Sequence, residues 1–455
     1  MRRVSAFGKW VTLAAVVVAW MACGWIGVAA AQDAGHSAVT PASRPDEWWM
    51  PRHEEKVARV KEGNVDLLMI GDSITHGWEG AGKAVWDAYY ADRNAVDLGF
   101  SGDRTQHVLW RLDNGEIDGI SPKLAVIMIG TNNWKDNSAE EIADGVTAIV
   151  DKLRTKLPEM KILLLAIFPR ANVGVTIREK LVQASALFSK CADGDMVHYL
   201  DIGRAFLDAD GNLPESVMPD LLHPNETGYQ LWAEAMEPSI AKLMGEIDAG
   251  KAPKGFERAF NGTDLSGWKG VLASPNDNPE KRKDLLPDDR AKAQEEANAL
   301  MLAHWKVEDG VLHYDGKGFS IATDRDYGDF EMLVDWKIKE LGDSGIYLRG
   351  APQVQIWDPA KWPEGSGGLY NNEKNPKDPL VCADNPIGEW NTFYIKMVGE
   401  RVTIYLNDQL VVDNVILENY WNREIPIYPT GQIELQHHGS DLWFKNIFIR
   451  EIARD

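Results

Sequence analysis

Residues 65–77, VDLLMIGDSITHG, place an apolar run directly before a short polar turn. An apolar run of this length, followed by a turn and an amphipathic stretch, is typical of a buried strand leading into a helix. The alternation recurs as far as residue 245. We expect strands at residues 65–70, 96–98, 124–129, 162–168 and 197–200, and helices at 84–90, 105–112, 139–157, 177–191 and 226–245. Continuously apolar strands predict a parallel sheet covered on both faces, a three-layer α/β domain.

The pattern changes after residues 246–255, a polar stretch that contains two glycines and a proline and that we interpret as a linker. Beyond it apolar and polar residues alternate with a period of two, most clearly over residues 330–338. Residues 407–409, Asn-Asp-Gln, separate two such runs and predict a hairpin turn. Many short alternating strands predict an all-β antiparallel sandwich. We therefore divide the chain into an α/β domain (residues 46–245) and a β domain (residues 256–455), with a charged, partly helical surface insertion at 274–298.

The first 31 residues predict a signal peptide. Arg2, Arg3 and Lys9 precede an apolar stretch over residues 10–28, and Ala29-Ala30-Ala31 supplies an A-x-A cleavage site. We expect this segment to be removed on export, so that the mature chain is periplasmic, cell-surface or secreted. An uncleaved membrane anchor is the alternative; no other stretch is long and apolar enough to cross a bilayer, so we expect no stable membrane insertion after removal.

The charge restricts the classes of partner. The formal net charge of −21 becomes −24 without the first 31 residues, which carry three basic and no acidic side chains. This acidity opposes binding to nucleic acid and to anionic membrane surfaces. Outside the predicted signal peptide only Cys191 and Cys382 remain, without metal-ligand spacing, so no metal or other cofactor is predicted. We expect two buried free thiols; a disulfide between them is the alternative. The oligomeric state is left open.

Three turns that follow predicted strands contain groups suited to acyl transfer. Ser73 lies in Gly-Asp-Ser-Ile-Thr, where a sharp strand-to-helix turn can present its hydroxyl; the alternative is a helix N-cap. Gly102 lies in Gly-Phe-Ser-Gly-Asp-Arg-Thr, where backbone can approach a ligand closely; the alternative is an ordinary turn glycine. Asn132 lies in Gly-Thr-Asn-Asn and can donate a side-chain N–H; the alternative is an Asx-turn.

A fourth turn, Asp220-Leu221-Leu222-His223-Pro224, precedes the last expected helix of this domain. A carboxylate three residues before an imidazole can fix its tautomer and orientation. A serine hydroxyl is a weak nucleophile and needs such a base. Alone, the pair is weak evidence, because most such pairs are solvated loop or capping residues. Together the four turns supply a nucleophile, an oriented base and three oxyanion donors, the parts of a serine hydrolase.

These motifs resemble those of the SGNH or GDSL hydrolases, whose domain is flavodoxin-like. The resemblance implies that Ser73, Asp220 and His223 form the catalytic triad. It also implies an oxyanion hole made by the backbone N–H groups of Ser73 and Gly102 and by the Asn132 side chain, with no metal. Residues 97–133, which contain His-Val-Leu-Trp-Arg-Leu at 107–112, are similar to the catalytic subunits of platelet-activating-factor acetylhydrolase.

The β domain resembles the concanavalin-like (jelly-roll) 3-keto-disaccharide hydrolase domain. The resemblance is carried by Phe-Asn-Gly-Thr-Asp-Leu-Ser-Gly-Trp at 260–268, Gly-Ile-Tyr-Leu-Arg-Gly at 345–350, Val-Gln-Ile-Trp-Asp at 354–358, Gly-Glu-Trp-Asn at 388–391 and Leu-Gln-His-His-Gly at 435–439. It implies binding or cleavage of saccharides. Strand alternation gives a candidate groove of Tyr347, Arg349, Gln355, Asp358, Glu434, Gln436 and His438. The alternative is the solvated outer face of a sandwich.

We expect an exported serine esterase that removes acetyl or other short acyl groups from carbohydrates, because an esterase joined to a sugar-type domain suggests one polymer for both. The β domain either binds the glycan or has a second, glycosidase-type activity. The first alternative is a short-acyl phospholipid esterase, which follows the acetylhydrolase resemblance. The second is a glycan-binding surface protein whose hydrolase domain is vestigial. The sequence does not identify the acyl group or the glycan.

Overall fold

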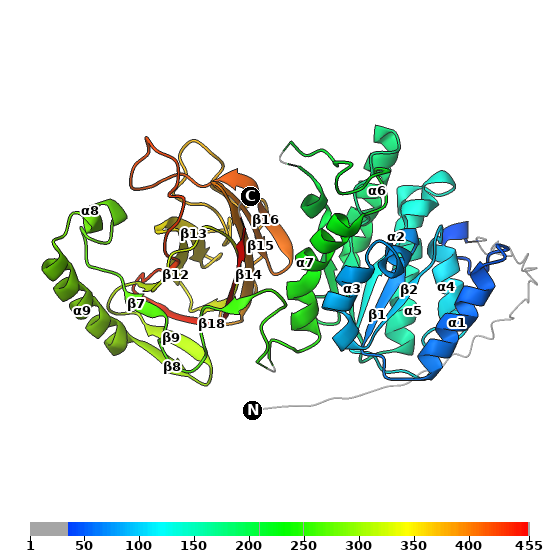
Figure 1. Ribbon diagram of the computed structural model, residues 1–455, viewed down its shortest axis with the longest axis horizontal. Coiled ribbons are helices and arrows are strands. Elements are labelled where there is room, and N and C mark those ends of the chain that lie inside the picture. Colours follow the sequence, from blue (N-terminus) through cyan, green and yellow to red (C-terminus); the bar gives the residue numbers. More distant parts are fainter. Residues whose placement is uncertain (1–34, 209, 249, 454–455) are drawn as a thin grey trace, which may run out of the picture. The chain divides into compact units, whose positions relative to one another are not determined.

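A computed structural model describes residues 35–453 except 209 and 249. The predicted signal peptide lies outside these described residues. Within them, no helix is both long and apolar enough to cross a membrane. The chain forms a parallel α/β sheet followed by two antiparallel sheets (Figure 1), so the predicted fold class is confirmed.

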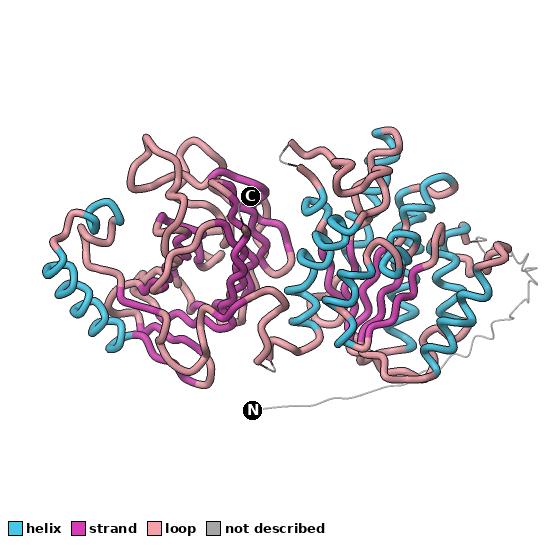
Figure 2. Tube along the Cα trace, in the orientation of Figure 1, coloured by secondary structure: helices cyan, strands magenta, loops and turns pink. Residues whose placement is uncertain are grey.

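The parallel sheet has the strand order β2-β1-β3-β4-β5. Its strands are β1 (Leu67–Gly71), β2 (Ala95–Gly99), β3 (Leu124–Met128), β4 (Lys161–Leu165) and β5 (Val197–Leu200). Its longer helices are α1 (Trp49–Lys61), α3 (Lys83–Tyr89), α4 (Thr105–Asp113), α5 (Ala139–Lys156), α6 (Val175–Phe188) and α7 (Glu226–Leu243). The apolar runs form strands because both of their faces are covered by helices (Figure 2).

Successive residues of β1 belong to two different cores. Leu68 and Ile70 pack with residues of α4, α5 and α6, whereas Leu67 and Met69 pack with residues of α3 and α7. Figure 1 shows α3 and α7 on the opposite side of the sheet from α1 and α4. The start of α7 follows the capping rules: the Asn225 side chain accepts a hydrogen bond from Gly228 N (3.0 Å), so that the helix begins immediately after the His223 turn.

The β domain packs two antiparallel sheets against each other. One sheet has the order β13-β12-β17-β10-β7; the other has the order β16-β15-β14-β11-β18-β9-β8, with β6 paired to β18. The strands are β6 (Glu257–Arg258), β7 (Trp268–Gly270), β8 (Trp305–Glu308), β9 (Val311–Asp315), β10 (Ile321–Thr323), β11 (Asp329–Ile338), β12 (Asp343–Leu348), β13 (Ala351–Trp357), β14 (Asn391–Val398), β15 (Arg401–Leu406), β16 (Gln409–Ile416), β17 (Glu434–Leu435) and β18 (Asp441–Ile452).

The apolar face of β11 lies in the core between these sheets, as its period of two predicts. The predicted turn at Asn407 and Asp408 joins β15 to β16, and both residues have positive φ (50° and 66°), the conformation that tight hairpins favour. The predicted insertion contains α8 (Pro279–Lys283) and α9 (Pro287–His304). Cys191 and Cys382 are free thiols, as expected, but neither is buried: Cys191 is partly exposed and Cys382 is exposed, contrary to the expectation.

Candidate active site

Ser73 is the first residue of a four-residue helix, α2 (Ser73–His76), at the carboxyl end of β1. The preceding residue, Asp72, is the N-cap and accepts a hydrogen bond from Ile74 N (3.0 Å). The sharp turn requires Gly71, because a Cβ there would lie 2.0 Å from Thr75 Oγ1. Ser73 is therefore not needed as a cap, and its hydroxyl points to another partner.

That partner is His223. The distance from His223 Nε2 to Ser73 Oγ is 2.9 Å, and the distance from His223 Nδ1 to Asp220 Oδ2 is 2.6 Å. The side chains of His223 and Asp220 are 42% and 54% exposed, so a substrate can reach the base. The structure thus brings the three predicted residues into one hydrogen-bonded chain, the geometry required for proton removal from the serine hydroxyl.

The Asp220 carboxylate also organises its own loop. Its Oδ1 accepts hydrogen bonds from Leu222 N (3.0 Å) and His223 N (2.7 Å). Partial burial alone would raise the pKa of Asp220, but hydrogen bonds from the backbone and side chain of His223 and from Leu222 N together hold it below its usual value. Asp220 consequently stays ionised at neutral pH, as its predicted role beside His223 requires.

The predicted oxyanion donors lie on the neighbouring loops. Gly102 follows β2 with φ 76°, a conformation that favours glycine. Asn132 lies in a 3₁₀ helix, η4 (Thr131–Lys135), and its Nδ2 donates to Asp103 O (3.0 Å). The Asn132 side chain therefore joins the loops after β2 and β3 instead of forming an Asx-turn. The action of both residues on an oxyanion remains a prediction.

A network of buried charged side chains holds the loop that contains Gly102. Asp103 accepts hydrogen bonds from Trp49 Nε1 (2.8 Å) and Arg111 Nε (2.9 Å), and Arg44 Nη1 donates to Ser101 O (2.6 Å). Burial raises the pKa of Asp103 and outweighs the lowering by Arg111. Sequence reasoning did not assign these supporting residues, although Asp103 and Arg111 lie inside the stretch that carries the acetylhydrolase resemblance.

The β domain contains a separate cavity of about 720 Å³ beside β12 and β13. Four of the seven predicted groove residues line it: Tyr347, Gln355, Gln436 and His438. Aromatic side chains form much of its wall, including Trp357 and Trp362, whose rings are stacked at 5.2 Å between centroids. Gln355 Nε2 donates to Asp343 Oδ1 (2.8 Å), which orients polar groups along this wall.

Glu434, the fifth predicted groove residue, is paired with Tyr347 in the register of β17 and β12 and is buried. Its Oε1 has no hydrogen-bond partner among the described residues, and Arg282 Nη2 lies 3.9 Å away. Burial raises the pKa of Glu434 to about 7, against the lowering by Arg282. Glu434 therefore lies next to a cavity-lining residue, although it is not itself part of the wall.

The prediction was wrong for Arg349 and Asp358, which are each 1% exposed and do not line the cavity. Arg349 follows the end of β12 with φ 54°, so strand alternation does not extend to it. Its guanidinium forms an ion pair with Asp329 (2.5 Å) and donates to Gly328 O and Gly399 O. Asp358 follows β13 and accepts hydrogen bonds from Leu341 N and Ala360 N. Both side chains hold turns together.

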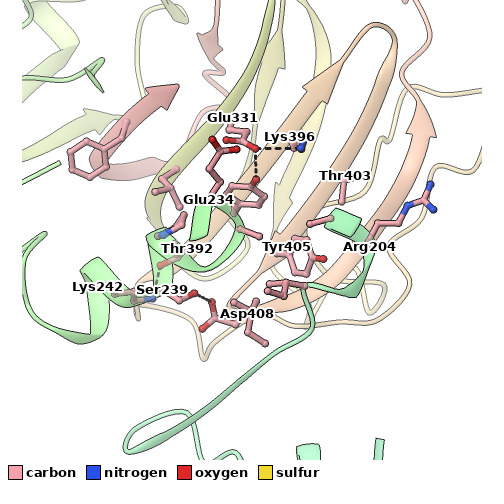
Figure 3. A pocket seen from close by; sticks show the side chains of 18 of the residues that line it. Arg204, Glu234, Ser239, Lys242, Glu331, Thr392, Lys396, Thr403, Tyr405 and Asp408 are labelled. Atoms are coloured by element: carbon pink, nitrogen blue, oxygen red, sulfur yellow. Dashed lines mark hydrogen bonds and ion pairs between the residues drawn. The ribbon is translucent and has the colours of Figure 1, made fainter. Parts of the chain in front are cut away.

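A further pocket of about 460 Å³ is drawn in Figure 3. Its polar lining groups are largely paired: Tyr394 Oη donates to Glu331 Oε1 (2.8 Å), and Lys242 Nζ donates to Thr392 Oγ1 (3.0 Å). None of the triad residues lines this pocket. We assign no chemistry to it.

Comparison with known proteins agrees with both halves of this description. Residues 69–231 match the model of the GDSL-like lipase/acylhydrolase family. The alpha1 subunit of platelet-activating factor acetylhydrolase IB from Homo sapiens is 32% identical over 225 residues, which cover 47% of this chain and 95% of that subunit. The chain belongs to the GDSL-like lipase/acylhydrolase family. Membership supports hydrolysis of ester bonds by the α/β domain of this acylhydrolase.

Other relatives of the acylhydrolase cover one half of the chain or the other. The alpha2 subunit from Rattus norvegicus is 35% identical over 205 residues, 44% of this chain and 87% of that subunit. Residues 255–450 match the model of a 3-keto-alpha-glucoside-1,2-lyase-like domain. A crystal structure of a Parabacteroides distasonis protein described as a glycosyl hydrolase has 27% identity and a TM-score of 0.34, covering 44% of this chain and 85% of that one. The two family-model matches and the acetylhydrolase relatives confirm both predicted family resemblances.

Proposed function

We propose that this acylhydrolase is an exported esterase that removes acetyl or other short acyl groups from carbohydrates. The observation that carries the catalytic part is the hydrogen-bonded chain from Ser73 through His223 to Asp220. The carbohydrate part is supported by the cavity with stacked tryptophans in the second domain and by the match of that domain to a glucoside-lyase-like model. Export rests on the sequence of the first 31 residues.

The reaction follows from the geometry of the triad. As Ser73 Oγ attacks the ester carbonyl carbon, its proton passes to His223 Nε2, and the carbonyl oxygen becomes an oxyanion. Backbone N–H groups of Ser73 and Gly102 and the Asn132 amide are the donors for that oxyanion; one such donor is typically worth about 10²–10³ in turnover. His223 then protonates the departing alcohol. Water, activated by the same imidazole, hydrolyses the acyl-enzyme and restores the serine hydroxyl.

A short-acyl phospholipid esterase is the second candidate, and the identity of 32–35% to platelet-activating factor acetylhydrolase subunits favours it. A vestigial hydrolase domain is disfavoured by the assembled triad.

The two esterase candidates are separated by acetate release. Acetylated sugars and polysaccharides, a short-acyl phospholipid and p-nitrophenyl acetate are incubated with the mature protein and, as a blank, with Ser73→Ala. We expect Ser73-dependent release from at least one glycan, at a higher kcat/KM than from the phospholipid. Hydrolysis of the phospholipid alone would replace the carbohydrate proposal with the second candidate.

For the β domain we propose that the cavity binds the same glycan. Aromatic faces and convergent side-chain amides suit a neutral sugar ring with its hydroxyls. Trp362→Ala, which removes one partly exposed ring of the stacked pair, is expected to weaken glycan binding about three- to tenfold, as measured by calorimetry on the Ser73→Ala background. Trp443→Ala, a partly exposed tryptophan outside the cavity, is the matched control. Equal effects of the two substitutions would contradict the assignment.

A further inference from the structure

A buried arginine connects two of the catalytic loops. Arg170 lies between β4 and α6 and is 8% exposed. Its Nη1 donates to Thr131 Oγ1 (3.1 Å) and lies 3.4 Å from Thr131 O, immediately before Asn132 in the chain. The next residue, Ala171, donates its N–H to Leu221 O (2.9 Å), immediately after Asp220. One short segment thus contacts both the oxyanion loop and the base loop.

The hydrogen bonds of Arg170 are all to neutral groups: besides Thr131, its Nε donates to Asn172 Oδ1 (3.0 Å). Within the described residues no carboxylate lies within 4 Å of its guanidinium. The other buried arginine of this domain differs: Arg111 contacts both Asp103 and Glu116 directly. Burying a cation without a direct ion pair costs folding free energy. The charge of Arg170 instead interacts with carboxylates that lie beyond direct contact with its guanidinium.

Those carboxylates belong to the hydrolytic site. Burial lowers the pKa of Arg170, while the charges of Asp72 and Asp220 raise it. Asp72 precedes the nucleophile and is fully buried, and its Oδ2 has no hydrogen-bond partner among the described side chains. Burial, reinforced by the charge of Asp103, raises the pKa of Asp72 to about 7, against lowering by Ile74 N and Arg170. Asp220 is in turn hydrogen-bonded to His223.

We propose that Arg170 is a positioning residue of the acyl-transfer site, holding the Asn132 loop against the Asp220–His223 loop. This inference rests on the proposed serine chemistry. The charge of Arg170 favours the ionised forms of the Asp72 and Asp220 carboxyl groups. Replacing Arg170 by a neutral side chain therefore removes both the donor to Thr131 and this electrostatic support.

The test measures the rate at which a fluorophosphonate labels Ser73 between pH 5 and 9, which does not require the natural acyl group. Wild type, Arg170→Met and Arg170→Lys are compared. Lys180→Met is the matched control, since Lys180 also donates two hydrogen bonds to this region, to Trp134 O and Asn137 O. Thermal unfolding of each variant checks folding.

For Arg170→Met we expect labelling of Ser73 about tenfold slower at pH 7. We also expect the acid limb of the pH–rate profile to move to higher pH, because without this cation the carboxyl groups of Asp72 and Asp220 are protonated more readily. The acid limb of Arg170→Lys should coincide with that of the wild type while its labelling rate is lower. The lysine ammonium retains the positive charge but lacks the planar set of N–H donors of the guanidinium. Lys180→Met should leave the limb in place.

An unchanged limb in Arg170→Met, or an equal shift in Lys180→Met, would overturn the positioning role while leaving the serine chemistry intact. Absence of Ser73-dependent labelling in the wild type would instead overturn the proposed function, and this inference with it. If Arg170→Met fails to fold, the decision falls to Arg170→Lys: a slower rate with an unmoved limb supports the role, and a rate equal to that of the wild type opposes it.

Discussion

Replacing Ser73 or His223 by alanine is expected to lower kcat for ester hydrolysis by about 10⁴-fold or more while leaving the fold intact. His223 Nε2 lies 2.9 Å from Ser73 Oγ, so neither residue can perform its catalytic role without the other. Without His223 the serine hydroxyl has no base, and without Ser73 the imidazole has no nucleophile to activate. Initial rates with p-nitrophenyl acetate measure the loss, and circular dichroism checks the fold.

Because the residues act as a unit, the double variant should be hardly slower than either single one. Asp220→Asn should retain more activity, because it keeps the side-chain shape but cannot stabilise the imidazolium. His198→Ala is the matched control: His198 lies on β5 and has no contact with the triad. Multiplicative losses in the double variant would mean that Ser73 and His223 do not work together. Wild-type rates in either single variant would exclude the triad.

The α/β half was predictable because one physical signal dominates it. The run at residues 65–70 cannot be solvated on either face, and the turn that ends it needs Gly71 to avoid a collision with Thr75. Chemistry placed at the carboxyl end of such a strand meets its partners at the same edge of the sheet. Ser73 and His223 could therefore be paired across 150 residues of sequence. The first helix, α1, was not predicted, although its amphipathic sequence contains the signal.

Arg349 and Asp358 show where sequence reasoning stopped being sufficient. Alternation assigns a face only while a strand continues, and both residues lie just beyond a strand end. Arg170 was not predicted for a different reason: the loops that its segment contacts meet only in the folded chain. No local pattern marks a residue whose hydrogen-bond partner, Thr131, belongs to another turn.

The buried pair of Arg349 and Asp329 gives the largest stability effect that we expect. Arg349→Met should destabilise the β domain by about 3–5 kcal/mol, because it leaves the buried Asp329 carboxylate without its guanidinium partner. It also removes the donors to Gly328 O and Gly399 O, which hold two turns. Differential scanning calorimetry of the full chain should show the transition of the β domain at lower temperature by about 10 °C.

Two comparisons make this prediction specific. Arg401→Met removes an exposed arginine of the β domain, whose guanidinium donates to Asn414 O. It should change the free energy of unfolding of this domain by less than about 1 kcal/mol. Arg349→Met combined with Asp329→Asn should recover part of the loss, because the neutral amide removes the buried negative charge that has lost its guanidinium. Ester hydrolysis by Ser73 should be unchanged in every case, since Arg349 holds turns in the β domain only. A thermal transition of Arg349→Met equal to that of Arg401→Met would mean that this buried ion pair adds nothing beyond its packing.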